Sequence, residues 1–303
     1  MTTTERIGII TDSVAVLPQH IRDELHIHVI PLNLEIDGRS YKDGIDLEPD
    51  DFYTLMRSSD RPPTTSQPSI GDFLEIYARA SEGVDRTVYF ALSSRLSRTC
   101  ETARLAARQF EEETGRHVDV FDCLTAASSQ GLIVSEAARV ARAGRGYEAM
   151  LRRAQELRPK VVMYAVVETL EYLVRGGRVP RVAGWVGEAL HVRPMIKLKD
   201  GLVSRAGFAR SMKHGFQRMG SHVQREIDAV RAAFGQAELR VAVMHADNRA
   251  GGEAFLHVVN QRFGPTESYL TAMTPVMGAH TGPGLVGLGY FVEAPVERAK
   301  YYD

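Results

Sequence analysis

Hydrophobic and polar positions alternate in blocks along the first half of the chain, where apolar runs of strand length are followed by helical patterns. This alternation is typical of an α/β domain with a largely parallel sheet. Strands are expected at residues 7–10, 28–36, 87–92 and 118–121, and the second alternates with a period of two before a turn signal at Asp37-Gly38. Helices are expected around residues 18–25 and 147–157, and after residues 69 and 131.

The segment 63–73 combines hydroxyl side chains with the start of a helix. Ser69 suits an N-cap position, because apolar residues follow it with helical spacing at Phe73, Ile76, Tyr77 and Ala80. Thr65 and Ser66 then precede a helix N-terminus, where free N–H groups and the helix dipole favour an anion. A purely structural role is the alternative, because Ser and Thr are common in caps and turns.

The second half of the chain predicts another α/β domain. Strands are expected at residues 161–167, 195–198, 239–244 and 285–292, and long helices at residues 208–234 and 249–263. Lys199-Asp200-Gly201 is typical of a hairpin turn. A chain of 303 residues exceeds what one hydrophobic core usually supports. We therefore expect two domains, residues 1–158 and 159–303.

Composition excludes several classes of function. A hydrophobic content of 44% and a charged content of 25% are typical of a soluble globular protein. The net charge of −1 provides neither a basic field for nucleic acid nor a polybasic membrane anchor. Cys100 and Cys123 are the two cysteines, and their spacing indicates no metal site and no disulfide framework. Without a signal peptide or an apolar run of about 18 residues, a cytoplasmic location is expected.

Four segments of the first half carry clustered hydroxyl groups, at residues 11–13, 64–69, 93–99 and 125–129. Three of them follow an expected strand and precede an expected helix. In open α/β sheets, ligands bind beyond the carboxyl ends of the strands, so these loops gather hydroxyls and helix N-termini at one edge. Such an edge suits a carboxylate or a phosphate. The chain contains no GxxxxGK[ST] motif, which argues against nucleoside triphosphate binding by a P-loop.

Residues 278–287 surround His280 with glycines. Gly282, Gly284 and Gly287 match the GxGxxG pattern formally, but residues 285–292 read as a strand where a dinucleotide fingerprint needs a helix. The glycines instead allow the backbone to approach a ligand closely and to present the imidazole of His280.

These motifs, in their order along the chain, resemble those of the DegV family of bacterial fatty-acid-binding proteins, which includes the binding subunit of fatty acid kinase. The resemblance is carried by residues 10–13, 29–32, 41–44, 65–69, 93–99, 170–178, 193–196 and 279–284. It implies a two-domain α/β carrier that holds a single long-chain fatty acid in a tunnel between its domains. It also implies no catalytic activity, no metal and no cofactor.

The residues of the family's binding site correspond to individual positions of this sequence. The resemblance implies that the fatty-acid carboxylate is bound by hydroxyls of two loops and by the histidine, here Thr65, Ser66, Ser94, Ser97 and His280. It assigns Arg178 to contact with the kinase partner. That partner is an ATP-dependent kinase, which converts the bound acid to an acyl phosphate for phospholipid synthesis.

The chain departs from the family pattern SSxLSGTY at two positions, because Arg98 stands in place of the glycine and Cys100 in place of the tyrosine. If the glycine needed a positive φ or a close ligand approach, Arg98 would disturb the loop. Alternatively, Arg98 adds a charge-assisted hydrogen bond to the carboxylate or to a phosphate.

Two other classes of function are weighed against the carrier. A serine-dependent acyl hydrolase or transferase would use a serine with His280, but the chain lacks GxSxG and no acidic residue is evidently placed to orient the histidine. A lipid-responsive regulatory protein is the third interpretation.

Overall fold

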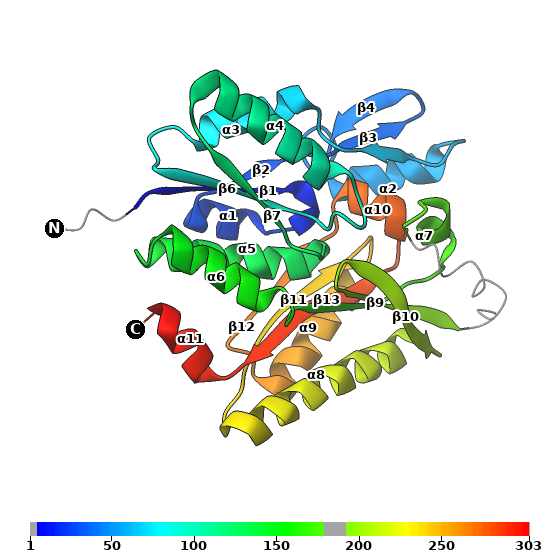
Figure 1. The fold of residues 1–303 in the computed structure, drawn as a ribbon. Coiled ribbons are helices and arrows are strands. Elements are labelled where there is room, and N and C mark those ends of the chain that lie inside the picture. Colours follow the sequence, from blue (N-terminus) through cyan, green and yellow to red (C-terminus); the bar gives the residue numbers. More distant parts are fainter. Residues whose placement is uncertain (1–4, 179–191, 303) are drawn as a thin grey trace.

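The computed structural model describes residues 5–178 and 192–302, which form three sheets covered by helices (Figure 1). The first sheet has four parallel strands in the order β2-β1-β6-β7, as the alternating pattern predicts. These strands are β1 (Ile7–Asp12), β2 (Ile27–Ile30), β6 (Arg86–Ala91) and β7 (Val118–Asp122).

Helices cover both faces of the parallel sheet, so its strands are buried on both sides (Figure 1). One face packs against α3 (Ile70–Ala80) and α4 (Thr99–Thr114). The other packs against α1 (Gln19–Leu25), α5 (Ala127–Arg142) and α6 (Tyr147–Leu157). A 3-10 turn, η1 (Ser13–Ala15), directly follows β1.

The second sheet has six strands in the order β10-β9-β8-β13-β11-β12, and only β11 and β12 pair in parallel. The strands are β8 (Val162–Val166), β9 (Arg193–Lys199), β10 (Leu202–Ala209), β11 (Glu238–His245), β12 (Glu267–Ala272) and β13 (Val286–Glu293). One face packs against α8 (Met212–Phe234) and α9 (Arg249–Phe263), and the other contacts α5. Helix α5 therefore lies between the two large sheets (Figure 1).

A third, small sheet, β4-β3-β5, stands beside the parallel sheet and carries part of the expected site. It consists of β3 (Asn33–Ile36), β4 (Arg39–Lys42) and β5 (Thr64–Ser66). Helix α2 (Pro49–Ser58) lies between β4 and β5 in the sequence. Segment 64–69, expected as a loop, therefore begins as a strand. The remaining helices are α7 (Glu171–Arg175), α10 (Pro275–Thr281) and α11 (Pro295–Tyr302).

The prediction of one strand over residues 28–36 is wrong. The structure divides it into β2 and β3, which belong to different sheets. Pro31 has no N–H for a strand ladder, and the N–H of Leu32 donates to the Ser13 hydroxyl (3.2 Å). The chain therefore leaves one sheet and enters the other at this point.

The helix expected at residues 208–234 begins later than predicted. Phe208 lies in β10, and α8 begins at Met212, where the Ser211 hydroxyl accepts the N–H of His214 (3.1 Å). The hairpin turn between β9 and β10 is confirmed, because Asp200 and Gly201 both have the positive φ that a two-residue turn of this kind requires.

The helix after Ser69 is confirmed. Ser69 and Asp72 form a capping box, in which each side chain accepts the other's backbone N–H. All four of the apolar positions that the spacing selects are buried: Phe73, Ile76, Tyr77 and Ala80.

Candidate functional site

The site is organised around a hydrogen bond between Thr65 and His280. Thr65 Oγ1 lies 2.8 Å from His280 Nε2, although the residues are 215 positions apart in the sequence. Thr65 is held in β5, which pairs with β3, and His280 lies in the last turn of α10. Helix α10 packs against β3, β5, α2 and α7, so three distant parts of the chain fix this pair.

The glycine-flanked turn expected at His280 is a short helix in the structure. Pro275 begins α10, and Gly282, with a φ of 71°, ends it before strand β13 follows. The strand after the glycines confirms that GxGxxG is not a dinucleotide fingerprint here. Gly278 lets α10 pack closely on α2, because a Cβ at this position would lie 2.6 Å from atoms of Phe52 and Tyr53.

His280 is uncharged at neutral pH. Burial, with a smaller contribution from the positive charge of Arg178, lowers the pKa of His280 from 6.5 to about 4. Its Nδ1 atom is buried and has no hydrogen-bond partner among the described residues. A Cβ at Gly176 would lie 2.5 Å from Nδ1, so the glycine leaves room for the imidazole. Only Nε2 therefore bonds to another side chain.

Arg178 borders the site and joins two of its loops. Its Nη1 donates to the carbonyl of Gly176 (2.6 Å), and its Nε donates to the carbonyl of Leu96 (3.4 Å). Burial lowers the pKa of Arg178, which nevertheless remains a cation at physiological pH. The half-buried guanidinium thus links the turn after α7 to the loop after β6.

The other expected site residues are not hydrogen-bonded to the Thr65–His280 pair. The Ser97 hydroxyl bonds with the Thr99 hydroxyl (2.8 Å) and accepts the Thr99 N–H (3.2 Å) at the start of α4. Ser94 is exposed, and its N–H donates to Asp122 (3.2 Å). Ser66 is exposed at the end of β5. Their part in binding a carboxylate stays a prediction.

The two departures from the family pattern cause no strain in this loop. Arg98 has a φ of −79°, which any L-residue adopts, and its exposed side chain pairs with Glu101 (3.0 Å). Cys100 is fully buried, and burial raises the pKa of its thiol to about 11. The thiol is therefore protonated and unreactive at neutral pH.

A cluster of buried apolar side chains, the central apolar cluster, lies between the small sheet with α2 and the six-stranded sheet, and it reaches α10. It draws on both halves of the chain, with members that include Leu34, Leu92, Met163, Ile196, Met244 and Ala279. Because Ala279 adjoins His280, this apolar region begins next to the polar pair. The arrangement suits an amphiphile with a polar head and an apolar tail.

Two buried carboxylates near this region were missed by the sequence analysis. Asp12 accepts hydrogen bonds from the Tyr89 hydroxyl and the Leu92 N–H (2.8 Å each), and burial raises its pKa to about 6. Asp43 accepts the N–H of Val276 (2.9 Å) at the start of α10. A polar residue at the end of an apolar run was the available signal for Asp12. Asp43 lies within residues 41–44, which are part of the family resemblance, but nothing in the local sequence assigned it a role.

Within residues 5–178 and 192–302, no group of three or more His, Cys, Asp or Glu side chains is arranged to hold a metal ion. No helix in the same part of the chain has the length and apolar character needed to cross a membrane.

Comparison with known proteins extends over almost the whole chain. A family model described as an uncharacterised protein of the DegV family matches residues 6–293. A DegV domain-containing protein of Listeria monocytogenes is 29% identical over 290 residues, which cover 95% of this chain and 99% of that protein. One from Lactococcus lactis is 33% identical over 278 residues, covering 92% of this chain and 96% of that protein.

Solved structures are similar over the same length. A fatty-acid-binding DegV family protein from Thermus thermophilus superposes with a TM-score of 0.86 at 30% identity, covering 94% of this chain and 99% of that one. DegV from Bacillus subtilis, described as a fatty-acid-binding protein, gives a TM-score of 0.82 at 26% identity, covering 95% and 99%. The overall α/β fold is therefore shared with both.

Proposed function

The chain belongs to the DegV family, and we propose that it binds one long-chain fatty acid and presents the carboxylate of that acid to an ATP-dependent fatty acid kinase. The observation that carries the proposal is the Thr65–His280 hydrogen bond beside the central apolar cluster. In this proposal the carboxylate binds at the polar pair, and the acyl chain occupies a tunnel among the apolar side chains between the domains, 1–158 and 159–303.

The acyl chain supplies most of the affinity. Burial of one methylene is worth about 0.8 kcal/mol, so about fourteen methylenes contribute roughly 11 kcal/mol before the costs of ordering and association, which remove several kcal/mol. Each hydrogen bond to the carboxylate adds about 1.5–3 kcal/mol. The polar pair therefore chiefly determines which end of the molecule faces the opening.

The head-group site suits a carboxylate that must remain reactive. In the Thr65–His280 hydrogen bond one group donates to the other, so the neutral pair keeps one O–H or N–H for the carboxylate. A fixed cation in direct contact would instead neutralise the oxygen that attacks a phosphoryl group. We assign Ser66, Ser94 and Ser97 to the same head group and Arg178 to the kinase partner. Burial of Arg178 beside the loop after β6 is consistent with a role at the edge of this site.

We further propose that the protein is a binding subunit without catalytic activity of its own. In a serine hydrolase the histidine is oriented by an acidic residue bonded to its second nitrogen. His280 Nδ1 has no such partner among the described residues, and Nε2 faces a threonine. Both observations weigh against nucleophilic catalysis at this histidine.

Native mass spectrometry of the protein purified from cells tests the function. We expect one long-chain fatty acid per chain, released by solvent extraction, and acyl phosphate formation when kinase and ATP are added. A purified protein that contains no fatty acid and does not bind added fatty acid contradicts the binding step. If the protein carries a fatty acid but no added kinase converts that acid to an acyl phosphate, only the presentation step is contradicted.

A further inference from the structure

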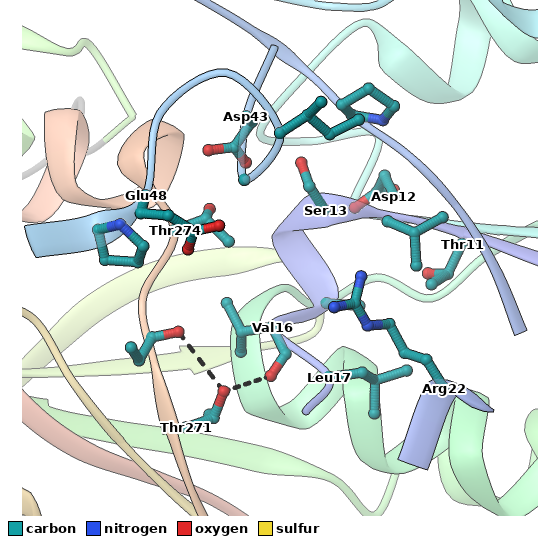
Figure 2. A pocket seen from close by; sticks show the side chains of 17 residues that line it. Thr11, Asp12, Ser13, Val16, Leu17, Arg22, Asp43, Glu48, Thr271 and Thr274 are labelled. Atoms are coloured by element: carbon teal, nitrogen blue, oxygen red, sulfur yellow. Dashed lines mark hydrogen bonds between the residues drawn. The ribbon is translucent and has the colours of Figure 1, made fainter. Parts of the chain in front are cut away.

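A cavity opens where β1 ends, and neither Thr65 nor His280 lines it. Its volume is about 190 Å³, and its walls come from the end of β1, α1, the loop between β4 and α2, and the segment that joins β12 to α10 (Figure 2). The proposed function makes no use of this cavity.

The cavity occupies a position where α/β sheets commonly bind ligands. Residues 11–13 at the end of β1 and residues 29 and 31 at the end of β2 line it, so it lies beyond the carboxyl ends of two neighbouring parallel strands. The strand order reverses one position away, between β1 and β6, and no residue of β6 lines the cavity. Ligands of open α/β sheets bind beyond the carboxyl ends of the strands.

Three polar groups that line the cavity lack hydrogen-bond partners in the described part of the chain. They are Asp43 Oδ2, Arg22 Nε and Thr274 Oγ1. Asp43 is only 2% exposed, and its other oxygen is already bonded to the N–H of Val276. An unpaired polar atom in a buried site costs about 1–3 kcal/mol, so a bound group that completes these bonds is stabilising.

The environment of Asp43 favours a positively charged donor. Burial raises the pKa of Asp43, and the nearby hydroxyls of Ser13 and Thr274 lower it in part, although neither makes a hydrogen bond of ordinary geometry with Oδ2. The carboxylate of Asp12 also lines the cavity, but Tyr89, Leu92 and Gln130 already donate to it. Asp12 therefore adds negative potential and no free acceptor.

Arg22 provides the complementary group. Figure 2 shows its guanidinium reaching from α1 toward the part of the cavity that holds Ser13 and Asp43. Its Nη2 donates to Gln19, and its Nε–H requires an acceptor. Apolar side chains, Val16, Leu17 and Val29, form another part of the wall. The cavity thus combines a carboxylate that can accept from a ligand (Asp43), a guanidinium that can donate to a ligand (Arg22) and an apolar surface.

We propose that this cavity binds a small zwitterion of the α-amino-acid class, with its ammonium group at Asp43 and its carboxylate at Arg22. Thr274 bonds the same ligand, and a short side chain rests on the apolar wall. Cavities of about 150 Å³ hold a molecule the size of benzene, so this cavity suits a ligand of about six to eight non-hydrogen atoms. Amino acids with small side chains have this size.

Isothermal titration calorimetry of the full chain tests the proposal with L-alanine, L-serine and L-valine as probes. Propylamine, propionate and glycerol serve as matched probes that carry only the ammonium, only the carboxylate or only hydroxyl groups. We expect at least one amino acid to bind with a Kd about tenfold or more below those of all three partial probes.

Three variants connect that binding to the cavity. Asp43→Asn retains an oxygen for the N–H of Val276 but loses the charge, while Arg22→Gln and Thr274→Val remove the other two groups. We expect each to weaken amino-acid binding by about tenfold, and Arg22→Gln and Thr274→Val to leave the fatty-acid content unchanged. Arg108→Gln, at an exposed position of α4, is the control and should bind as the parent protein does.

Three results overturn the proposal. If only glycerol binds, the cavity is a polyol site. If no probe binds, the cavity holds only water. Amino-acid binding that survives both Arg22→Gln and Asp43→Asn places the ligand elsewhere and also overturns it. Thermal melts of each variant identify loss of the fold, and Thr274→Val alone decides the outcome if both charged variants unfold.

Discussion

Asp43 Oδ1 accepts a hydrogen bond of 2.9 Å from the backbone N–H of Val276, so a loop residue from the N-terminal part of the chain holds the first turn of α10. The same helix carries His280 in its last turn. Because a helix of seven residues has little stability of its own, this bond and the packing on α2 position the histidine against Thr65.

Replacement of Asp43 by alanine should therefore destabilise the protein and weaken fatty-acid binding. The Val276 N–H loses its acceptor, which costs about 1–3 kcal/mol of the free energy of unfolding. Asp43→Asn, which retains an oxygen, should lose less than half of that amount. Urea denaturation measures both, with exposed Asp60→Asn as the control. Equal losses for the alanine and asparagine variants would contradict a capping role.

Thr65→Val should lower the affinity for fatty acid without unfolding the protein. The substitution preserves shape but removes the hydroxyl that faces His280 and, in our proposal, the carboxylate. The loss of one charge-assisted hydrogen bond predicts about a tenfold or greater rise in Kd. A fluorescent fatty-acid displacement assay measures it, and Thr64→Val, at an exposed neighbour in β5, is the matched control. Identical affinities for the two variants would remove Thr65 from the head-group site.

Fatty-acid binding should raise the pKa of His280. Burial lowers this pKa from 6.5 to about 4. A carboxylate beside the ring favours the imidazolium, because opposite charges within about 4–6 Å stabilise each other. NMR titration of the His280 ring signals, with and without bound fatty acid, measures the shift. A pKa that stays the same or falls on loading would exclude direct contact with the carboxylate.

The same histidine makes the lipid-free protein less stable in acid. Between pH 6.5 and about 4 the unfolded chain binds a proton at His280 that the folded chain does not. The free energy of unfolding therefore rises with pH across this window, and at most about 3 kcal/mol is lost at its acid end. His280→Asn should flatten that part of the stability–pH curve, as measured by urea denaturation at each pH. A parallel curve for the variant would refute the assignment.

The sequence predicted correctly those elements whose caps and apolar spacing lie within the element itself. Ser69 and the apolar spacing after it determine the start and the buried face of α3, and the bounds of α9 agree with the expected helix at residues 249–263. The prediction failed where tertiary structure decides the outcome. Pro31 ends a strand because the chain changes sheets there, and Phe208 lies in β10, where it pairs across the hairpin with Pro194 of β9.

The candidate site shows the same division. Local signals and the family resemblance selected Thr65 and His280, but no spacing rule relates residues 215 positions apart, and only the packing of α10 on β5 brings them together. Asp43 escaped notice because its role is to bond a backbone N–H from the other end of the chain. The roles of Ser66, Ser94, Ser97 and Arg178 stay predictions, since their contacts are equally compatible with loop structure.

Gly176 offers a test that changes the shape of the site without removing any polar group. Its φ of −67° suits alanine, so a substitution adds no backbone strain, but the new Cβ would lie 2.5 Å from His280 Nδ1. Gly176→Ala should therefore displace the imidazole from Thr65 and raise the Kd for fatty acid by about tenfold or more.

The control for Gly176→Ala is Gly71→Ala in α3, where the nearest atom outside the helix backbone lies 3.7 Å from the added Cβ. That change should leave fatty-acid affinity intact and stabilise the helix by about 0.5–1 kcal/mol, because alanine has the higher helix propensity. If both alanine variants bind fatty acid as tightly as the parent protein, the position of His280 does not govern binding, and the head group must be held elsewhere.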